Sequence, residues 1–306
     1  MESEKVPKKQ HFVPQYYLRR FADDKNRLWV YDQKRSSIYQ SRTNDVCERN
    51  FHYEIEATAK REWHGRHFLP GKIELGLSRI ESRQAALLRK IDEQLENGRI
   101  HEKERRSLCW LIGNLIARHP VMLEDHEPDY ATLMEDPDVK RDCEILEQLG
   151  MGNEIGALAR GANQMVLALW RRKNTPTNYI QEDLKKLQCM FIKTGEEARF
   201  ITSSLPPHLS VSIWEDGDYH LDYLALPLSS TFAVIYSKNG SRKSKIRKIS
   251  DEEVIGLNAD YFISEPTREQ ILSGRKEDLQ QARKLAGSFR LREATANSLE
   301  SLIYQE

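Results

Sequence analysis

The spacing of apolar residues changes twice along this chain of 306 residues, and that change restricts the fold more than any other feature. RLWVYDQ (27–33) and SIYQSR (37–42) are rich in β-branched and aromatic residues and flank a short polar turn, which predicts a hairpin. From about residue 73 apolar side chains recur at helical spacing, and from about residue 187 short strand-like segments alternate with polar turns. Strands at both ends with helices between them predict an α+β fold.

The individual elements follow from the same pattern. Helices are predicted at 73–95, 108–116 and 155–169, with a shorter one in 135–150. Five successive strands are predicted to form an antiparallel meander: QCMFIK, ARFITSS, LSVSIW, HLDYLALPL and TFAVIYS. Asn239-Gly240 predicts a further hairpin, and Ser250 followed by Glu253 predicts a capping box at the start of a helix.

We expect one domain over residues 1–306, because no Pro/Gly/Ser-rich linker divides the chain. Its three parts are an N-terminal unit with the hairpin (8–60), a helical section (61–185), and a C-terminal part with antiparallel strands and helices (186–306). The N-terminal hairpin and the C-terminal meander are expected to share a sheet. A division into two domains near residue 185 is the alternative.

Composition argues against several classes of protein. Lys plus Arg and Asp plus Glu number 47 each, so nucleic acid or an acidic membrane would have to be bound by local patches. The apolar runs are far shorter than the roughly 18 residues of a membrane-spanning helix, and MESEKVPKK lacks the apolar segment of a secretory signal, which predicts a cytoplasmic protein with no membrane partner. Four separated cysteines without a CxxC pair predict reduced, buried thiols.

The stretch KKQHFVPQYYLRRFAD (8–23) has more polar variety than a helix start or a strand requires. Histidine suits proton transfer near neutral pH, and a neighbouring glutamine or arginine can orient a substrate, so His11 and Gln15 are candidates for a site. The alternative is that both side chains hold backbone groups in an N-terminal arm whose path is fixed by Pro14.

HFVPQYYLRRF (11–21) closely resembles the N-terminal signature of the bacterial domain of unknown function 4238 family. Later segments are similar to further motifs of that family across most of the chain: LWVYDQ, NFHY (50–53), RHP (118–120), FITSSLP (200–206), PLS (227–229) and Asn258. The resemblance implies a fold and a set of positions but no reaction, because the family is named for having no assigned activity. Ser204 stands where the family usually has aspartate, which weakens or removes here any reaction that depends on that acid.

Polar positions from four distant segments are expected to converge in one pocket. His11 would transfer a proton and Arg118 would hold a phosphate as the two catalytic residues. The candidate substrate-binding residues of the pocket are Gln15, Tyr17, Thr202, Ser203 and Asn258. A buried polar network that serves structure alone is the alternative, in which Arg118 and His119 only end a helix.

Metal sites are weakly indicated. WHGRH places His64 and His67 three residues apart, and Cys47 with His52 would complete four ligands, but Gly65 within the pair favours a loop. The acidic pairs at 124–125 and 135–136 are typical of loop or helix-end charges. We therefore expect no metal and no cofactor.

The basic run SKNGSRKSKIRK (237–248) is the clearest local patch, with Lys243 and Lys245 near its centre. On a hairpin these side chains would hold a nucleic-acid backbone. The run lacks aromatic residues for base stacking, so a solvated edge hairpin protected by lysines is the alternative.

The leading hypothesis is an effector or accessory protein directed at nucleic acid, in the form of a metal-independent nuclease of toxin or phage-defence type. No Walker lysine loop, GxGxxG, GxSxG or HExxH motif is present. The absence of the Walker loop removes the commonest class of nucleotide-hydrolysing enzymes. A non-catalytic module that binds a ligand or partner protein, with a structural N-terminal motif, is the main alternative, and a small-molecule hydrolase is a third. The sequence leaves open whether the chain is an enzyme and what its oligomeric state is.

Overall fold

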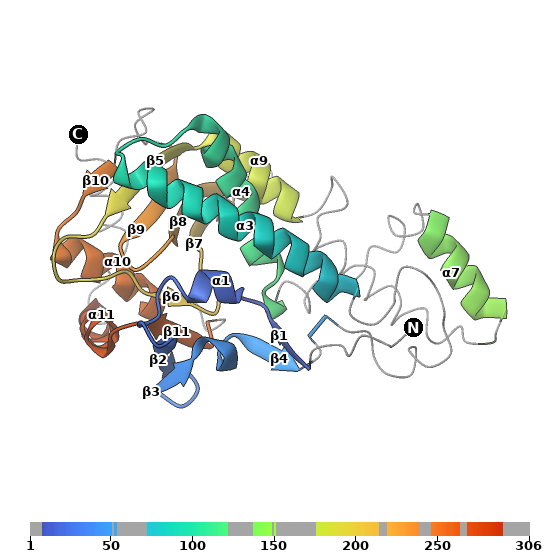
Figure 1. Ribbon diagram of the computed structural model, residues 1–306, viewed down its shortest axis with the longest axis horizontal. Coiled ribbons are helices and arrows are strands. Elements are labelled where there is room, and N and C mark those ends of the chain that lie inside the picture. Colours follow the sequence, from blue (N-terminus) through green and yellow to red (C-terminus); the bar gives the residue numbers. More distant parts are fainter. Residues whose placement is uncertain are drawn as a thin grey trace.

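The computed structural model describes residues 8–50, 52–53, 72–121, 137–148, 150, 176–213, 219–238, 246–263 and 268–289. Within these residues the predicted α+β fold is confirmed, since helices pack beside three mostly antiparallel sheets (Figure 1). Several predicted features lie outside the described residues: the helix at 155–169, the acidic pairs at 124–125 and 135–136, the Asn239-Gly240 turn, His64, His67, Lys243 and Lys245.

The largest sheet contains the predicted meander. Its strands have the order β10-β5-β9-β8-β7, and the pairs β5-β9, β9-β8 and β8-β7 are antiparallel. The strands are β5 (Gln188–Lys193), β7 (His208–Ile213), β8 (Tyr219–Pro227), β9 (Phe232–Ser237) and β10 (Ile246–Lys248). The segment ARFITSS does not join this sheet, because its short strand β6 (Thr202–Ser203) pairs elsewhere.

The predicted basic hairpin is wrong in its strand pairing. β10 runs parallel to β5, and β5 lies between β10 and β9, so β9 and β10 are not neighbours. The difference has a physical reason, because β5 carries the buried side chains Cys189, Phe191 and Ile192 and therefore takes the interior place. The charged segment Ile246–Lys248 suits an edge.

The N-terminal hairpin shares a sheet with C-terminal strands, although with different ones from the meander. β2 (Arg27–Asp32) and β3 (Ser37–Arg42) form the hairpin, and the sheet has the order β3-β2-β11-β6. β11 (Gln270–Ser273) pairs antiparallel with both β2 and β6, so it joins two segments that are far apart in the sequence. A third, two-stranded sheet pairs β1 (Lys9–His11) with β4 (Glu48–Asn50).

The helices cover the two larger sheets (Figure 1). The helices α3, α4 and α9 lie together on the side of the meander sheet, and α11 packs on β2 and β11 next to α10. Their bounds, with those of the remaining helices, are α1 (Gln15–Leu18), η1 (Thr43–Asp45), α3 (Lys72–Glu96), α4 (Glu102–Ala117), α7 (Pro137–Gln148), α9 (Pro176–Lys186), α10 (Asp251–Ile263) and α11 (Lys276–Phe289). In the part of the chain that the structure describes, no helix is long and apolar enough to cross a bilayer.

Local sequence signals account for the helix ends. α3 buries Leu77, Leu88, Ile91 and Leu95 on one face and ends before Gly98, which has a φ of +70°. The predicted capping box opens α10, because Ser250 Oγ accepts from the Glu253 backbone N–H at 3.2 Å and Glu253 Oε2 accepts from the Ser250 N–H at 2.7 Å.

One hydrophobic core draws on all three predicted parts of the chain. It includes Tyr17 and Leu18 from α1, Ile91 from α3, and Phe191 and Val234 from the meander sheet. A smaller cluster lies between α10, α11 and the four-stranded sheet and contains Ile201, Ala259, Ile271 and Leu279. The N-terminal arm is therefore packed into the centre of the fold.

Two glycines test how closely the backbone just after α1 approaches the backbone just after β11. A Cβ at Gly274 would lie 2.5 Å from the carbonyl oxygen of Phe21, whereas a Cβ at Gly256 in α10 would meet nothing within 4 Å. We expect Gly274→Ala to lower the free energy of unfolding by about 1–3 kcal/mol, because backbone must move. Gly256→Ala should raise it by up to about 1 kcal/mol through helix propensity. Urea unfolding followed by circular dichroism measures both, and an unchanged Gly274→Ala would contradict the packing described.

Candidate functional site

Arg118 lies at the centre of the N-terminal candidate site and is only 1% exposed. Its Nε donates to Tyr53 Oη at 3.1 Å, its Nη1 to Glu81 Oε1 at 2.7 Å, and its Nη2 to the His11 carbonyl oxygen at 2.5 Å. Burial opposes the charge of Arg118, but Tyr53 and Glu81 raise its pKa above the ordinary value, so the group stays charged. The structure therefore brings His11 and Arg118 together, through the backbone of His11 and not through its imidazole.

The imidazole of His11 is half-buried and uncharged at neutral pH. Burial lowers its pKa below the ordinary value, against a backbone hydrogen bond with Thr43 and the nearby carboxylates Glu48 and Glu81. Within the described part of the chain, His11 Nε2 is buried and has no hydrogen-bond partner. An imidazole held on one nitrogen by a carbonyl presents the other as an acceptor, which is the arrangement a general base needs.

The helix α1 is bound to α3 and to the meander sheet. Arg20 contacts both Asp92 oxygens, at 2.7 and 2.5 Å, and its Nε donates to the Leu228 carbonyl. Tyr16 Oη donates to Gln84 Oε1 at 2.8 Å. Gln15 does not join these contacts, because its Oε1 accepts from Arg19 Nη2 on the exposed side of the helix at 2.7 Å. This contact of Gln15 is thus with Arg19 and not with another candidate site residue.

Tyr17 and Thr202, two of the candidate substrate-binding residues, contact each other. Tyr17 Oη lies 3.2 Å from Thr202 Oγ1 and donates to the Pro227 carbonyl at 2.6 Å. All three groups are buried, and Ser203 bonds to both backbone groups of Leu205, donating at 2.6 Å and accepting at 3.2 Å. The hydroxyls of Thr202 and Ser203 are therefore used inside the protein.

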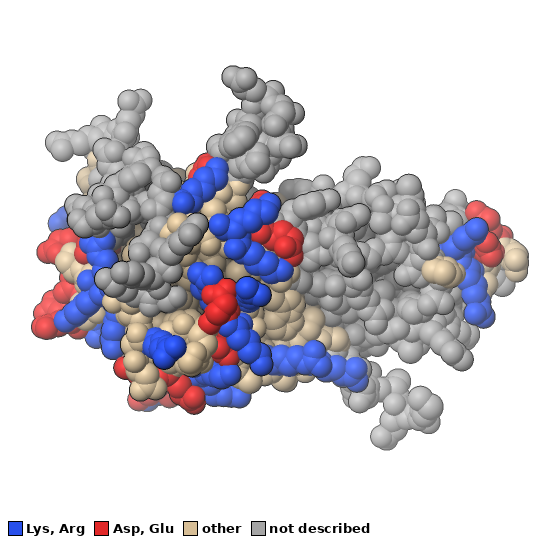
Figure 2. Space-filling view, turned by 90° about the horizontal axis from the view of Figure 1, so that it is seen from above, with Lys and Arg blue, Asp and Glu red and all other residues tan. Residues whose placement is uncertain are grey.

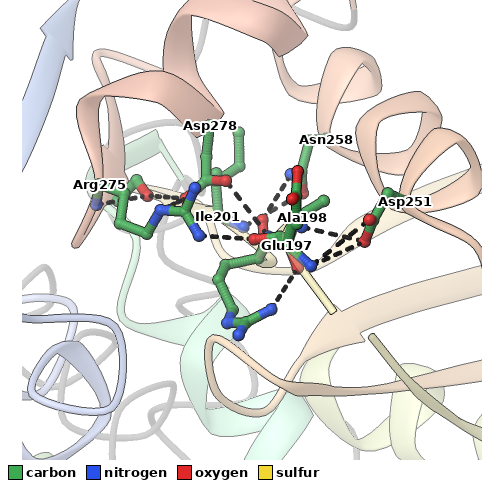
Figure 3. Close-up of polar contacts among 9 residues, drawn as sticks. Glu197, Ala198, Ile201, Asp251, Asn258, Arg275 and Asp278 are labelled. Carbon is green, nitrogen blue, oxygen red and sulfur yellow. Dashed lines mark hydrogen bonds and ion pairs between the residues drawn. The ribbon is translucent and has the colours of Figure 1, made fainter. Parts of the chain in front are cut away.

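Side chains from α10 and α11 hold the backbone just before β6 (Figure 3). Asn258 Oδ1 accepts from the Ile201 N–H at 3.1 Å, and its Nδ2 donates to the Arg199 carbonyl at 2.8 Å. Asp251 Oδ1 accepts from the Ala198 N–H at 3.0 Å, and Asp278 Oδ1 accepts from the Arg199 N–H at 3.2 Å. Asn258 is thus placed about the segment 197–201, apart from His11 and Arg118.

The backbone just after β6 is held in the same way. Ser204 exchanges bonds with Gln270 of β11, through its N–H at 2.8 Å and its Oγ, which accepts from the Gln270 N–H at 3.3 Å. Tyr261 Oη donates to the Pro206 carbonyl at 2.5 Å, and Arg268 Nη2 donates to the Pro207 carbonyl at 3.2 Å. Ser204 is buried and lies directly after β6.

Sequence reasoning missed a group of buried titratable side chains beside this segment. Burial raises the pKa of Asp260 to about 7, against the opposing charge of Arg268, and burial lowers the pKa of His208 to about 4. His208 Nε2 lies 2.9 Å from Tyr223 Oη, and a cavity of about 20 Å³ beside His208, Asp260 and Tyr261 has room for one water. The only sequence signal for this group of side chains was that Asp260 follows Asn258 by two residues on α10.

Two of the residues considered as metal ligands, His52 and Cys47, lie in the described part of the chain and make other contacts. His52 Nε2 lies 3.4 Å from the Arg118 carbonyl, and the imidazole packs edge-on against Phe12. Cys47 Sγ donates to Gln270 Oε1 at 3.5 Å. Among the residues that the structure describes, no group of three or more His, Cys, Asp or Glu side chains is arranged to hold a metal ion.

A family model described as "Protein of unknown function (DUF4238)" matches residues 9–277. The chain belongs to the DUF4238 family. The suspected resemblance is thereby confirmed over most of the chain. No curated protein and no solved structure matches the sequence.

Asn258 should contribute strongly to the stability of this DUF4238 protein. Asn258→Ala leaves the Ile201 N–H and the Arg199 carbonyl without their bonds, and we expect a loss of about 2–4 kcal/mol in the free energy of unfolding. Asn97→Ala is the matched control, because Asn97 is exposed and should change stability by less than about 0.5 kcal/mol. Urea unfolding compares the two, and equal small losses would refute the role given to Asn258.

Asp260 should make stability depend on pH. Its pKa is about 7 in the folded state against an ordinary value of 3.8, so between these values the folded state holds a proton that the unfolded state has lost. Its contribution is therefore present below about pH 4 and is lost as the pH rises toward 7. We expect wild type to lose stability relative to Asp260→Asn across this window, by up to about 1.4 kcal/mol per pH unit.

Urea unfolding of both chains at pH 4.5, 5.5, 6.5 and 7.5 measures that difference. His208, whose pKa is about 4, destabilises the folded state as the pH falls, but it is present in both chains and cancels. A difference that does not change with pH would show that Asp260 is ionised throughout.

Proposed function

We propose that this chain is a non-catalytic binding module in which the N-terminal motif is a structural joint. The observation that carries the proposal is the full commitment of Arg118, whose three guanidinium nitrogens bond to Tyr53, Glu81 and the His11 carbonyl. A guanidinium that is 1% exposed and already donates to three protein acceptors cannot reach a substrate phosphate unless these bonds break. The remaining polar contacts of the motif, at Tyr16, Tyr17 and Arg20, also end on groups of the protein itself.

The cytoplasm is the compartment that we propose for this module. None of the four cysteines forms a disulfide, and all four are buried. Thiols that have no disulfide partner suit a reducing compartment.

A second candidate function, cleavage of nucleic acid without a metal, has one observation in its favour. His11 Nε2 has no hydrogen-bond partner within the described residues, and the lowered pKa keeps the imidazole neutral and able to accept a proton. The basic run that contains Lys243 and Lys245 would supply contacts to the nucleic-acid backbone in that case. The binding module could have either nucleic acid or another protein as its partner.

Stability and activity measured together separate the two candidates. We expect Arg118→Gln to lose about 3–5 kcal/mol in the free energy of unfolding, because it leaves Glu81 and the His11 carbonyl without their donor. Arg89→Gln on the exposed face of α3 is the matched control and should change stability by less than about 0.5 kcal/mol.

The activity assay uses single-stranded RNA and DNA with a chelator present. We expect no cleavage by wild type or by His11→Ala. Cleavage by wild type that disappears in a normally stable His11→Ala would overturn the binding module and establish His11 as a catalytic residue.

A further inference from the structure

A pocket of about 700 Å³ lies between α4, α9 and the meander sheet, away from the N-terminal joint. Its size is that of a site for a small organic molecule. The residues that line it are Glu102, Arg105, Arg106, Ser107, Cys109 and Trp110 of α4, Gln181, Leu184 and Lys185 of α9, with Leu187 and Tyr236.

Positive charge exceeds negative charge at this pocket. Arg105, Arg106 and Lys185 line it, and Glu102 is the one acidic side chain among its lining residues. Glu102 accepts from Arg105 Nη2 at 2.7 Å and from Arg106 Nε at 3.0 Å, so a single carboxylate already lies between two guanidinium groups. The side chain of Arg106 is 72% exposed, and that of Lys185 is 36% exposed and contacts Glu182 Oε1 at 2.6 Å, so a ligand anion would replace Glu102 and Glu182 as their partners.

The inner wall of the pocket is apolar and uncharged. Leu184 and Tyr236 are buried, and Cys109 Sγ lies 3.7 Å from Tyr236 Oη. Burial raises the pKa of the Cys109 thiol and of the Tyr236 hydroxyl, so neither carries charge at neutral pH. A ligand that fills this space has an apolar body at the wall and an anionic end at the cations.

The surrounding surface favours a small ligand over a polymer. Figure 2 shows Lys and Arg side chains on the described part of the upper face, with Asp and Glu side chains between some of them. Nucleic-acid chains need a row of cations to neutralise successive phosphates. A pocket with three cations instead matches one doubly charged group.

We propose that this pocket binds a small phosphate monoester with a flat apolar group, of which a nucleoside monophosphate is representative. The inference rests on the proposed function, since it names the ligand class of a module that acts by binding. The phosphate would lie among Arg105, Arg106 and Lys185 and replace the Glu102 carboxylate between the two arginines. The base would lie against Leu184 and Leu187.

Titration calorimetry at low salt with adenosine 5′-monophosphate, adenosine and inorganic phosphate tests the proposal. Adenosine 5′-monophosphate should bind more tightly than either of its parts, and its affinity should fall as salt is added. Lys185→Gln and Arg106→Gln should each weaken it about three- to tenfold. Glu102→Gln should strengthen it severalfold, because it removes the competing carboxylate.

Each charge variant has a matched control outside the pocket. Lys186→Gln on α9 and Lys103→Gln on α4 remove an exposed charge one and three residues away from Lys185 and Arg106, and neither residue lines the pocket. Both should leave the affinity within about twofold of wild type. The opposite sign expected for Glu102→Gln separates binding from general loss of folding.

Two results would overturn the inference. One is no heat of binding for adenosine 5′-monophosphate at millimolar concentration with wild type, and the other is an equal loss for pocket and control variants. Neither result bears on the joint at Arg118, whose stability test and cleavage assay involve other residues. Failure of the ligand class and failure of the binding module are therefore distinguishable.

Discussion

The fold depends on how the backbone of residues 197–207 obtains its hydrogen bonds. This segment crosses the interior, and only Thr202 and Ser203 join a strand ladder. Buried N–H and carbonyl groups need partners, and most of these partners are side chains from α10, α11 and the loop before β11. They are Asp251, Asn258, Tyr261, Arg268 and Asp278. Because these residues follow the segment by about fifty to eighty positions, the two halves of the C-terminal part can only fold together.

The N-terminal arm also makes buried polar contacts, and these reach β6, the meander sheet and α3. Tyr17 reaches Thr202 and Pro227, and Arg20 joins Asp92 of α3 to the Leu228 carbonyl. The arm therefore connects β6, the meander sheet and the helices through buried polar contacts as well as through its apolar side chains. Such contacts select one arrangement, because any displacement leaves buried groups without partners.

Local patterns predicted the elements well and their long-range pairing poorly. Apolar spacing indicated the hairpin, the helices α3 and α4 and the meander, and the capping box at Ser250 is as expected. The insertion of β11 between β2 and β6 had no local signal, because QILS is four residues long.

For the candidate site, residue types led to the expectation that His11 and Arg118 lie together, but not that the contact is made by the His11 carbonyl. Gln15 lies two residues before the buried Tyr17, which is a large rotation on a helix, and contacts Arg19 on the exposed side, so its substrate-binding role stays a prediction. Asp260 was missed because its pKa is set by burial, which no short pattern reveals.

Burial also separates polar groups that maintain the fold from those free to meet a ligand. Arg118 is buried, and each of its nitrogens has a protein acceptor, so its charge is fully used. At the pocket beside α4, three cations share a lining with one carboxylate, and two of them are well exposed. Exposed ion pairs contribute little to stability, so a chain loses little when a ligand anion replaces one of their partners. The excess of cations among the pocket's lining residues therefore supports the proposed ligand, whereas the polar contacts of the N-terminal arm serve the fold, except at His11 Nε2.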